Sequence, residues 1–143
     1  MTSKVARRPY RWGVVGGTFD IFHKGHAELL KKAFEVADKV LIGITSDDFA
    51  KKLKQHEVNP YEIRREAVLS FLRSSGLLER SEIITIDDPY GPSDSDPRFE
   101  VIVVSEETLP RALEINRRRL SRGLKELDII VIPWVRGEDG KPI

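Results

Sequence analysis

Short apolar runs alternate with amphipathic segments along the chain, and this order predicts an α/β fold with parallel strands. The runs are rich in β-branched residues, whereas the segments between them place apolar residues at helical spacing. The predicted strands cover residues 11–15, 39–44, 83–86, 100–104 and 128–133. The predicted helices cover residues 26–37, 47–53, 60–75 and 108–122.

The ends of two predicted helices carry clear signals. Asn59 stands before Pro60 and is expected to be an N-cap, with Glu62 completing a capping box. Gly76 and Gly123 follow the third and fourth helices and are expected at their C′ positions.

Right-handed crossovers between parallel strands leave few arrangements of the sheet. The one we predict is a doubly wound sheet of five strands in the order 3-2-1-4-5, with helices on both faces. Ligands of such sheets bind beyond the carboxyl ends of the strands, where the winding reverses, so the residues after strands one and four are expected to form the site. We expect one domain over residues 1–143, with residues 1–11 as a leader.

Composition narrows the class of protein. The chain has 143 residues and no cysteine, which excludes a disulfide scaffold, a thiolate metal site and a cysteine nucleophile. Its 24 Lys and Arg nearly cancel 23 Asp and Glu, so no nucleic-acid partner is expected. The apolar run 40–44 is far shorter than the ~18 residues of a membrane-spanning helix, and no export signal precedes it. We therefore expect a cytoplasmic protein without a membrane partner.

The first strand is followed by the stretch GGTFDIFHKGH, residues 16–26, which leads into a helix. Gly16 and Gly17 allow the backbone to turn tightly and to approach a ligand. Thr18 supplies a hydroxyl, and Gly25 removes a side chain where the helix begins. Because the free amides and the positive dipole end of a helix attract anions, this junction is predicted to bind phosphate.

Two histidines lie in the same stretch. His23 and His26 can donate hydrogen bonds to phosphate oxygens. A metal pair is the less favoured interpretation, because the only other histidine is His56 and there is no cysteine. Two isolated histidines would be ordinary surface residues, but their place in the complete stretch favours a phosphate role.

The strings Gly17-Thr18-Phe19-Asp20 and His23-x-Gly25-His26 resemble the signature of the nucleotidyltransferase superfamily with an H-x-G-H motif. This resemblance implies a Rossmann-like fold and the transfer of a nucleotidyl group from ATP or CTP to a phosphate acceptor.

Further strings resemble the archaeal type of phosphopantetheine adenylyltransferase over residues 12–143. They are KAFEV at 32–36, IGITSD at 42–47, YExRR at 61–65, VVSEET at 103–108, then Asn116 and GLKxL at 123–127. The resemblance implies that ATP and 4′-phosphopantetheine give dephospho-CoA and pyrophosphate in coenzyme A biosynthesis, with Mg²⁺ bound to ATP. It implies dephospho-CoA or CoA as further ligands, and a monomer or a small homo-oligomer.

The resemblance also implies roles for single residues. Thr18 would contact the phosphoryl group under attack, His26 would stabilise the transition state, and His23 would contact the ATP phosphates. Lys51 or Lys52 would bind the acceptor phosphate, and residues 105–108 would meet adenine or ribose. The residues expected to bind ATP are Gly16, Gly17, Thr18, Phe19, His23, Gly25, His26, Ser105, Glu106, Thr108 and Asn116.

Three further regions leave alternatives open. Of Arg117, Arg118 and Arg119, at most two can face a triphosphate, and the rest are expected on the surface. Within the loop at 87–99, residues 87–92 either close over the pantetheine arm, with the carboxylates of Asp87 and Asp88 holding Mg²⁺ through water, or form an exposed turn, which is the favoured interpretation. Family members continue after residue 143 with a phosphate-binding Ser-Ser/Thr-Thr-x-x-Arg motif, and this motif is either absent from the protein or follows the last residue of this sequence.

Two alternative functions remain at this stage. One is a cytidylyltransferase acting on glycerol or ethanolamine phosphate, or an archaeal FAD synthetase, of the same superfamily. The segment after the fourth strand, residues 105–108, favours the adenylyltransferase over these. The other is a nucleotide- or CoA-binding module without turnover.

Overall fold

The computed structural model describes residues 8–54 and 57–133. Its strands are β1 (Tyr10–Gly17), β2 (Ala37–Thr45), β3 (Ser81–Ile86), β4 (Val101–Ser105) and β5 (Asp128–Ile132). Its helices are α1 (Lys24–Val36), α2 (Asp47–Lys54), α3 (Tyr61–Ser74) and α4 (Leu109–Ser121), with a 3₁₀ turn at Leu78–Arg80. In these two ranges no helix is long and apolar enough to cross a membrane.

The five strands form one parallel sheet in the order β3-β2-β1-β4-β5, which confirms the predicted topology. β1 lies in the middle, where Gly16 stands opposite Gly43 of β2 and Gly13 stands opposite Val101 of β4. The winding reverses between β1 and β4, so the carboxyl ends of these two strands border the switch point.

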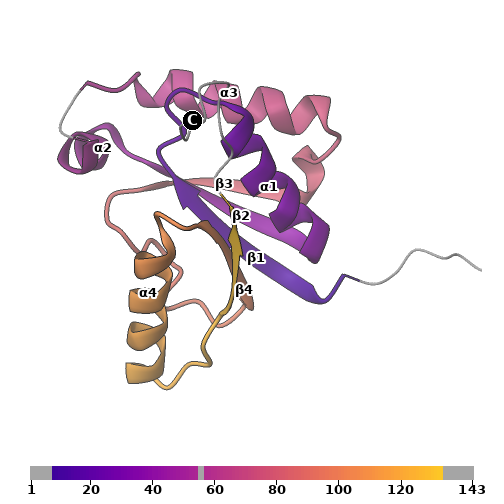
Figure 1. Cartoon of the computed structure of the whole chain (residues 1–143), viewed down its shortest axis with the longest axis vertical. Coiled ribbons are helices and arrows are strands. Elements are labelled where there is room, and N and C mark those ends of the chain that lie inside the picture. The colour runs from indigo at the N-terminus through magenta and orange to yellow at the C-terminus, as the bar shows by residue number, and fades with distance from the viewer. Residues whose placement is uncertain (1–7, 55–56, 134–143) are drawn as a thin grey trace, which may run out of the picture.

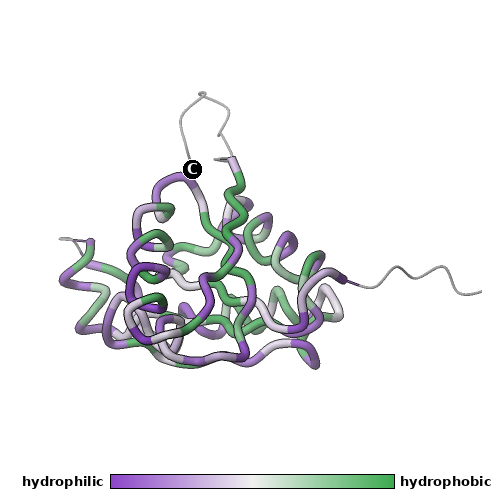
Figure 2. Tube along the Cα trace, turned by 90° about the horizontal axis from the view of Figure 1, so that it is seen from below, coloured by the Kyte–Doolittle hydropathy of each residue, from purple (hydrophilic) through white to green (hydrophobic). Residues whose placement is uncertain are grey.

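Helices cover both faces of the sheet (Figure 1). α1 and α3 pack on one face, where Leu30 and Val68 join Ile42 in a buried cluster. α4 packs on the other face, where Ile115 joins Leu41 in a second cluster. Figure 2 shows the hydrophobic positions concentrated towards the strands in the middle of the trace. β2 is a continuous apolar run because Leu41 and Ile42 point to opposite faces and both faces are covered.

Several predicted boundaries shift. α1 begins at Lys24, because the side chain of His23 caps it. Asn59 is not the N-cap of α3: Pro60 takes that position without a side-chain bond, and the predicted capping box is absent. The Asn59 amide instead donates to Asp20 Oδ1 at 2.6 Å. An Asn side chain that finds a tertiary acceptor is no longer available to a helix end.

The expected leader overlaps the sheet. β1 starts at Tyr10, whose hydroxyl donates to Asp128 Oδ2 at 2.7 Å, and the Arg11 amide donates to Glu100 Oε1 at 2.6 Å. Residues 10 and 11 therefore belong to the fold, while residues 1–7 of the expected leader lie outside the described residues. Gly76 and Gly123 have φ values of +70° and +77°, the left-handed conformation that suits a C′ glycine.

Candidate functional site

A cavity of about 1000 Å³ opens at the carboxyl edge of the sheet. The end of each strand contributes to its wall: Gly17 of β1, Thr45 of β2, Ile86 of β3, Ser105 of β4 and Ile132 of β5. The cavity is therefore where the topology places a ligand site.

Most of the predicted site residues meet in this cavity. Those that line it are Gly16, Gly17, Thr18, Phe19, His23, Gly25, His26, Ser105 and Thr108. Four others are absent from its wall, namely Glu106, Asn116, Lys51 and Lys52. The motif after β1 and the segment after β4 thus face one space, although residues 27–104 separate them in the chain.

The two histidines bond to each other through the start of α1. The Gly25 amide donates to His23 Nδ1 at 2.9 Å, and the His23 amide donates to His26 Nδ1 at 3.1 Å. These bonds form a reciprocal capping box, and the two rings stack with centroids 3.9 Å apart. The Gly25 amide is therefore used within the helix start and is not one of its free amides.

This arrangement decides which ring nitrogens carry hydrogen. A nitrogen that accepts a hydrogen bond carries no proton, so in the neutral rings of His23 and His26 the hydrogen is on Nε2. Burial lowers the pKa of His23, and burial, together with the nearby His23 and Lys54, lowers the pKa of His26 to about 4, against the opposing effect of Asp20. Near neutral pH the site presents two uncharged imidazoles, each with an Nε2–H available to an anion.

The base of the cavity is made of glycines and hydroxyls. A Cβ on Gly17 would come within 3.2 Å of the Phe19 ring, and a Cβ on Gly43 within 3.0 Å of Ile86 Cγ2, so a side chain at either position would require its neighbour to shift. Thr18 and Thr45 are both buried, and the Thr45 hydroxyl donates to Thr18 Oγ1 at 3.2 Å. Thr45 was not identified from sequence, where it appeared only within a string shared with the family.

Phe19 supports the motif from inside. Its backbone is left-handed, with φ at +56°, and its side chain is 1 % exposed. The ring lies 5.2 Å from the ring of His26 and packs over Gly17. Phe19 thus contributes to the cavity chiefly by holding His26 in place.

The turn after β4 closes on itself. The Ser105 amide donates to Thr108 Oγ1 at 3.1 Å, and the Thr108 amide donates to the Ser105 carbonyl at 3.1 Å. Thr108 is the N-cap residue of α4 but makes no side-chain bond to the helix amides, because its oxygen already bonds to Ser105. α4 adds Arg111 and Arg117 to the cavity wall, and Arg111 was missed by the sequence analysis.

The three consecutive arginines of α4 have three different environments. Arg117 lines the cavity, and Arg118 donates to Asp94 Oδ2 at 2.7 Å. The sequence analysis expected the arginines that do not face the cavity to lie on the surface, but Arg119 is only 1 % exposed. It donates to the carbonyls of Ser93 and Lys125 at 2.8 and 2.7 Å. Backbone carbonyls from two loops stabilise this buried guanidinium.

Asn116 has a structural position. Its Nδ2 donates to the Leu127 carbonyl at 2.9 Å and its Oδ1 accepts the Leu127 amide at 2.7 Å. The side chain is 5 % exposed and both ends of its amide are occupied. The structure therefore places Asn116 away from the predicted ATP contact, as a clamp between α4 and the segment before β5.

The lysine that lines the cavity is Lys54. Phe49 and Ala50 are the buried residues of α2, and Leu53 and Lys54 follow them by four positions, on the same side of the helix. Lys51 and Lys52, which sequence analysis expected at the acceptor phosphate, are exposed on other sides of this helix. The spacing of four positions from the buried Ala50 was the signal that could have identified Lys54.

The loop between β3 and β4 forms a turn. Asp88 Oδ1 accepts the amides of Tyr90 and Gly91, both at 2.8 Å, which supports the turn interpretation of this carboxylate. Across residues 8–54 and 57–133 no group of three or more His, Asp or Glu could hold a metal ion.

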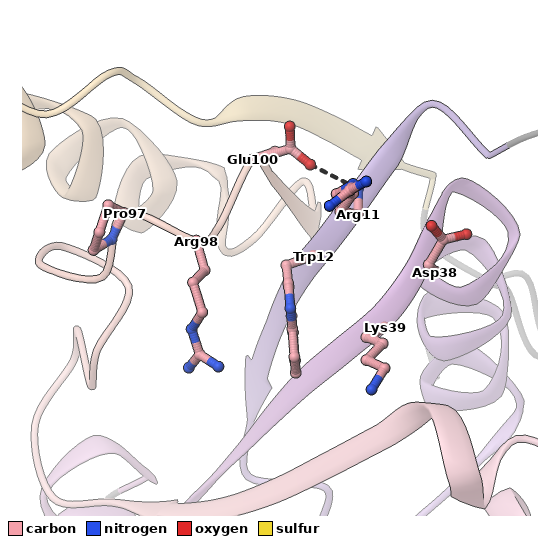
Figure 3. A pocket seen from close by; sticks show the side chains of 7 residues that line it. All are labelled: Arg11, Trp12, Asp38, Lys39, Pro97, Arg98 and Glu100. Atoms are coloured by element: carbon pink, nitrogen blue, oxygen red, sulfur yellow. Dashed lines mark hydrogen bonds between the residues drawn. The ribbon is translucent and has the colours of Figure 1, made fainter.

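A second hollow, of about 550 Å³, lies at the amino ends of the strands. Figure 3 shows Trp12 between Arg98 and Lys39, whose cationic groups lie 4.8 and 5.9 Å from the indole centroid. The hollow contains none of the motif residues, and its aromatic face is occupied by the protein's own cations. The carboxyl-edge cavity is accordingly the candidate site.

Comparisons with known proteins agree with this geometry. The model of the cytidylyltransferase-like family matches residues 14–143. A phosphopantetheine adenylyltransferase of Methanothermobacter thermautotrophicus is 47% identical over 137 residues, covering 96% of this chain and 82% of that protein. Another, of Methanopyrus kandleri, is 46% identical over 134 residues, covering 94% and 85%.

Among solved structures, a protein of unknown function from Archaeoglobus fulgidus superimposes with a TM-score of 0.77 at 34% identity, covering 84% of this chain and 87% of that one. The fold, the residues of the cavity and the sequence similarity thus indicate the same family. The chain belongs to the cytidylyltransferase-like family and, within it, to the phosphopantetheine adenylyltransferases.

Proposed function

We propose that this chain transfers the adenylyl group of ATP to 4′-phosphopantetheine, giving dephospho-CoA and pyrophosphate. The observation that carries the proposal is the cluster of Thr18, His23 and His26 at the switch point, with two imidazole Nε2–H groups available as donors. The cluster belongs to a chain whose relatives named phosphopantetheine adenylyltransferase are almost half identical to it.

The proposed reaction is a direct displacement at the α-phosphorus. An oxygen of the acceptor phosphate forms a bond to this phosphorus, while the bond from the phosphorus to the bridging oxygen breaks and its electron pair leaves with pyrophosphate. The attacking oxygen is already anionic, so no general base is required. With a pKa of about 4, His26 is neutral and contributes a hydrogen bond rather than a proton. Catalysis then consists of positioning and of stabilising charge at phosphorus.

Each wall of the cavity has a part in this proposal. His26 and Thr18 donate to the α-phosphoryl group, and His23 donates to the phosphates that leave. Lys54, on α2, supplies the positive charge for the acceptor phosphate. The nucleoside lies towards residues 105–108 beyond β4, and the cations on α4 face the triphosphate.

Mg²⁺ enters the proposal as part of the substrate. We propose that Mg²⁺ is carried on the ATP phosphates, where it would neutralise charge on the leaving group. CoA, which contains the same pantetheine and adenosine groups as the product, is a further proposed ligand. The proposal includes the cytoplasm as the location and a monomer or a small homo-oligomer as the active form.

The test is a panel of nucleotides and acceptors with pyrophosphate release as the readout. ATP with 4′-phosphopantetheine should give the fastest release, and His26→Ala, purified in the same way, should remove it and so exclude a contaminating enzyme. Faster release from CTP with glycerol 3-phosphate would replace the proposal by a cytidylyltransferase. Binding of ATP without any release would replace it by a binding module.

A further inference from the structure

Arg64 of α3 is buried directly behind the cavity wall, with 1 % of its surface exposed. Its Nη1 donates to the carbonyls of Thr18 and Thr45 at 3.1 and 2.8 Å. Its Nε donates to the Asn59 carbonyl at 2.8 Å, and its Nη2 to Asp47 Oδ1 at 2.9 Å. One guanidinium therefore connects the ends of β1 and β2 with the starts of α2 and α3.

The same guanidinium sets the direction of a short hydrogen-bond chain. Arg64 Nη1 also lies 3.2 Å from Thr45 Oγ1, and a guanidinium can only donate. Thr45 Oγ1 therefore accepts from Arg64, and its own hydrogen goes to Thr18 Oγ1 at 3.2 Å. Thr18 Oγ1 thus accepts within the chain, which leaves the hydrogen of Thr18 for a partner outside it.

The reverse direction is disfavoured by burial and charge. If Thr18 donated to Thr45, the Thr45 hydrogen would need another acceptor beside a cation, at a residue only 3 % exposed. A buried donor without an acceptor costs free energy, and among the described residues no buried side-chain nitrogen or oxygen lacks a partner.

We propose that Thr45, oriented by Arg64, is a positioning residue that turns the Thr18 hydroxyl into a hydrogen-bond donor towards the reacting phosphoryl group. This inference rests on the proposed function, because it takes the contact of Thr18 with that group from it. Both threonines line the cavity, but only Thr18 would touch the substrate. Thr45 acts through Thr18 by occupying its acceptor side.

The substitution that tests this is Thr45→Val, which removes the hydroxyl and keeps the branched shape. Arg64 retains the carbonyls of Thr18 and Thr45 as acceptors, so the buried charge stays paired. In this variant the Thr18 hydroxyl loses its fixed orientation. We expect kcat to fall about tenfold and KM for ATP to change by less than about twofold, because the oriented donor acts mainly in the transition state.

The decisive measurement is a double-mutant cycle with Thr18→Val. In the Thr18→Val background, Thr45→Val should change kcat by less than about twofold, because the hydroxyl that it orients is gone. Thr45→Ser should restore kcat, since it keeps the hydroxyl. Thr85→Val is the matched control: this threonine of β3 bonds the Tyr61 hydroxyl outside the cavity, and its removal should leave kcat unchanged.

Equal losses of kcat in both backgrounds, a rise in KM alone, or failure of Thr45→Ser to restore kcat would overturn the proposal. If the wild-type chain shows no turnover, the proposed function fails separately. The same four proteins are then compared by calorimetric titration with ATP, which carries the phosphoryl group that Thr18 is proposed to contact. Coupling between the two substitutions in binding supports the orientation of Thr18, and independent effects refute it.

Discussion

Replacing His26 by alanine removes two interactions that the structure separates clearly. One is the Nδ1 acceptor for the His23 amide at 3.1 Å, which belongs to the capping of α1. The other is the Nε2–H of a ring that lines the cavity, and we assign this donor to the transition state. The first loss should lower the free energy of unfolding by about 1 kcal/mol, as for other helix caps. The second should appear in the rate.

The expected loss of rate follows from the kind of donor that is removed. A preorganised donor to developing charge contributes ~2.7–4 kcal/mol, so adenylyl transfer should slow by a factor of about 10² or more. ATP affinity should change little, because the α-phosphate gains charge only as the acceptor attacks. His23→Ala should show the opposite balance, with a larger loss of ATP affinity than of turnover. The reason is that His23 is proposed to contact the leaving phosphates of ATP both before and during the reaction.

His26→Gln separates capping from catalysis. Glutamine is favoured at the third position of a helix, where its oxygen can accept the His23 amide and keep the cap. Its nitrogen branches from the same carbon as that oxygen and does not reach the place of Nε2. Stability should therefore return while the rate stays low. Single-turnover kinetics and calorimetric ATP binding decide the matter: near wild-type turnover with lost ATP affinity in His26→Ala would refute the transition-state role.

Three further predictions concern other parts of the site. Burial, His23 and Lys54 lower the pKa of His26 to about 4, below its usual 6.5, so between these pH values the unfolded chain binds more protons than the folded one. The free energy of unfolding measured in urea should therefore fall as the pH is lowered from 6.5 towards 4. The fall should be smaller in His26→Gln. Lys54→Gln should raise KM for 4′-phosphopantetheine in turnover assays at least about tenfold, whereas Lys51→Gln, on an exposed side of the same helix, should not. Asn116→Ala should lower the free energy of unfolding in urea by about 2 kcal/mol or more, because the amide and carbonyl of Leu127 lose their partners, while kcat of the folded protein stays the same.

The sheet order and the location of the site were predictable because both depend on short-range patterns. A continuous apolar run such as β2 identifies a strand covered on both faces, and handedness then limits the topology. The motif from Gly16 to His26 is contiguous, so its residues were certain to lie together. The segment after β4 joins it because parallel strands end at the same edge of the sheet.

Contacts between distant segments were not predictable in this way. From the sequence, Arg119 is predicted to be a surface cation. Only the folded chain supplies the carbonyls that stabilise its buried guanidinium. Asn59 matches the preference for an N-cap, but the carboxylate of Asp20, 39 positions away in the chain, takes its amide. Thr45 carries no special residue signal, because its importance comes from two neighbours, Arg64 and Thr18.

The neutral state of the histidine pair also affects how the products leave. If both rings were cationic, each would attract the departing anion by roughly 4 kcal/mol at ~4 Å and an effective dielectric constant of 20. One such attraction slows dissociation about a thousandfold. Burial keeps His26 uncharged and lowers the pKa of His23, so in the proposed reaction both rings would contact phosphate oxygens as neutral hydrogen-bond donors. On this side of the cavity pyrophosphate would then depart without breaking an ion pair, so any slow step in its release would come from the arginines of α4, Arg111 and Arg117.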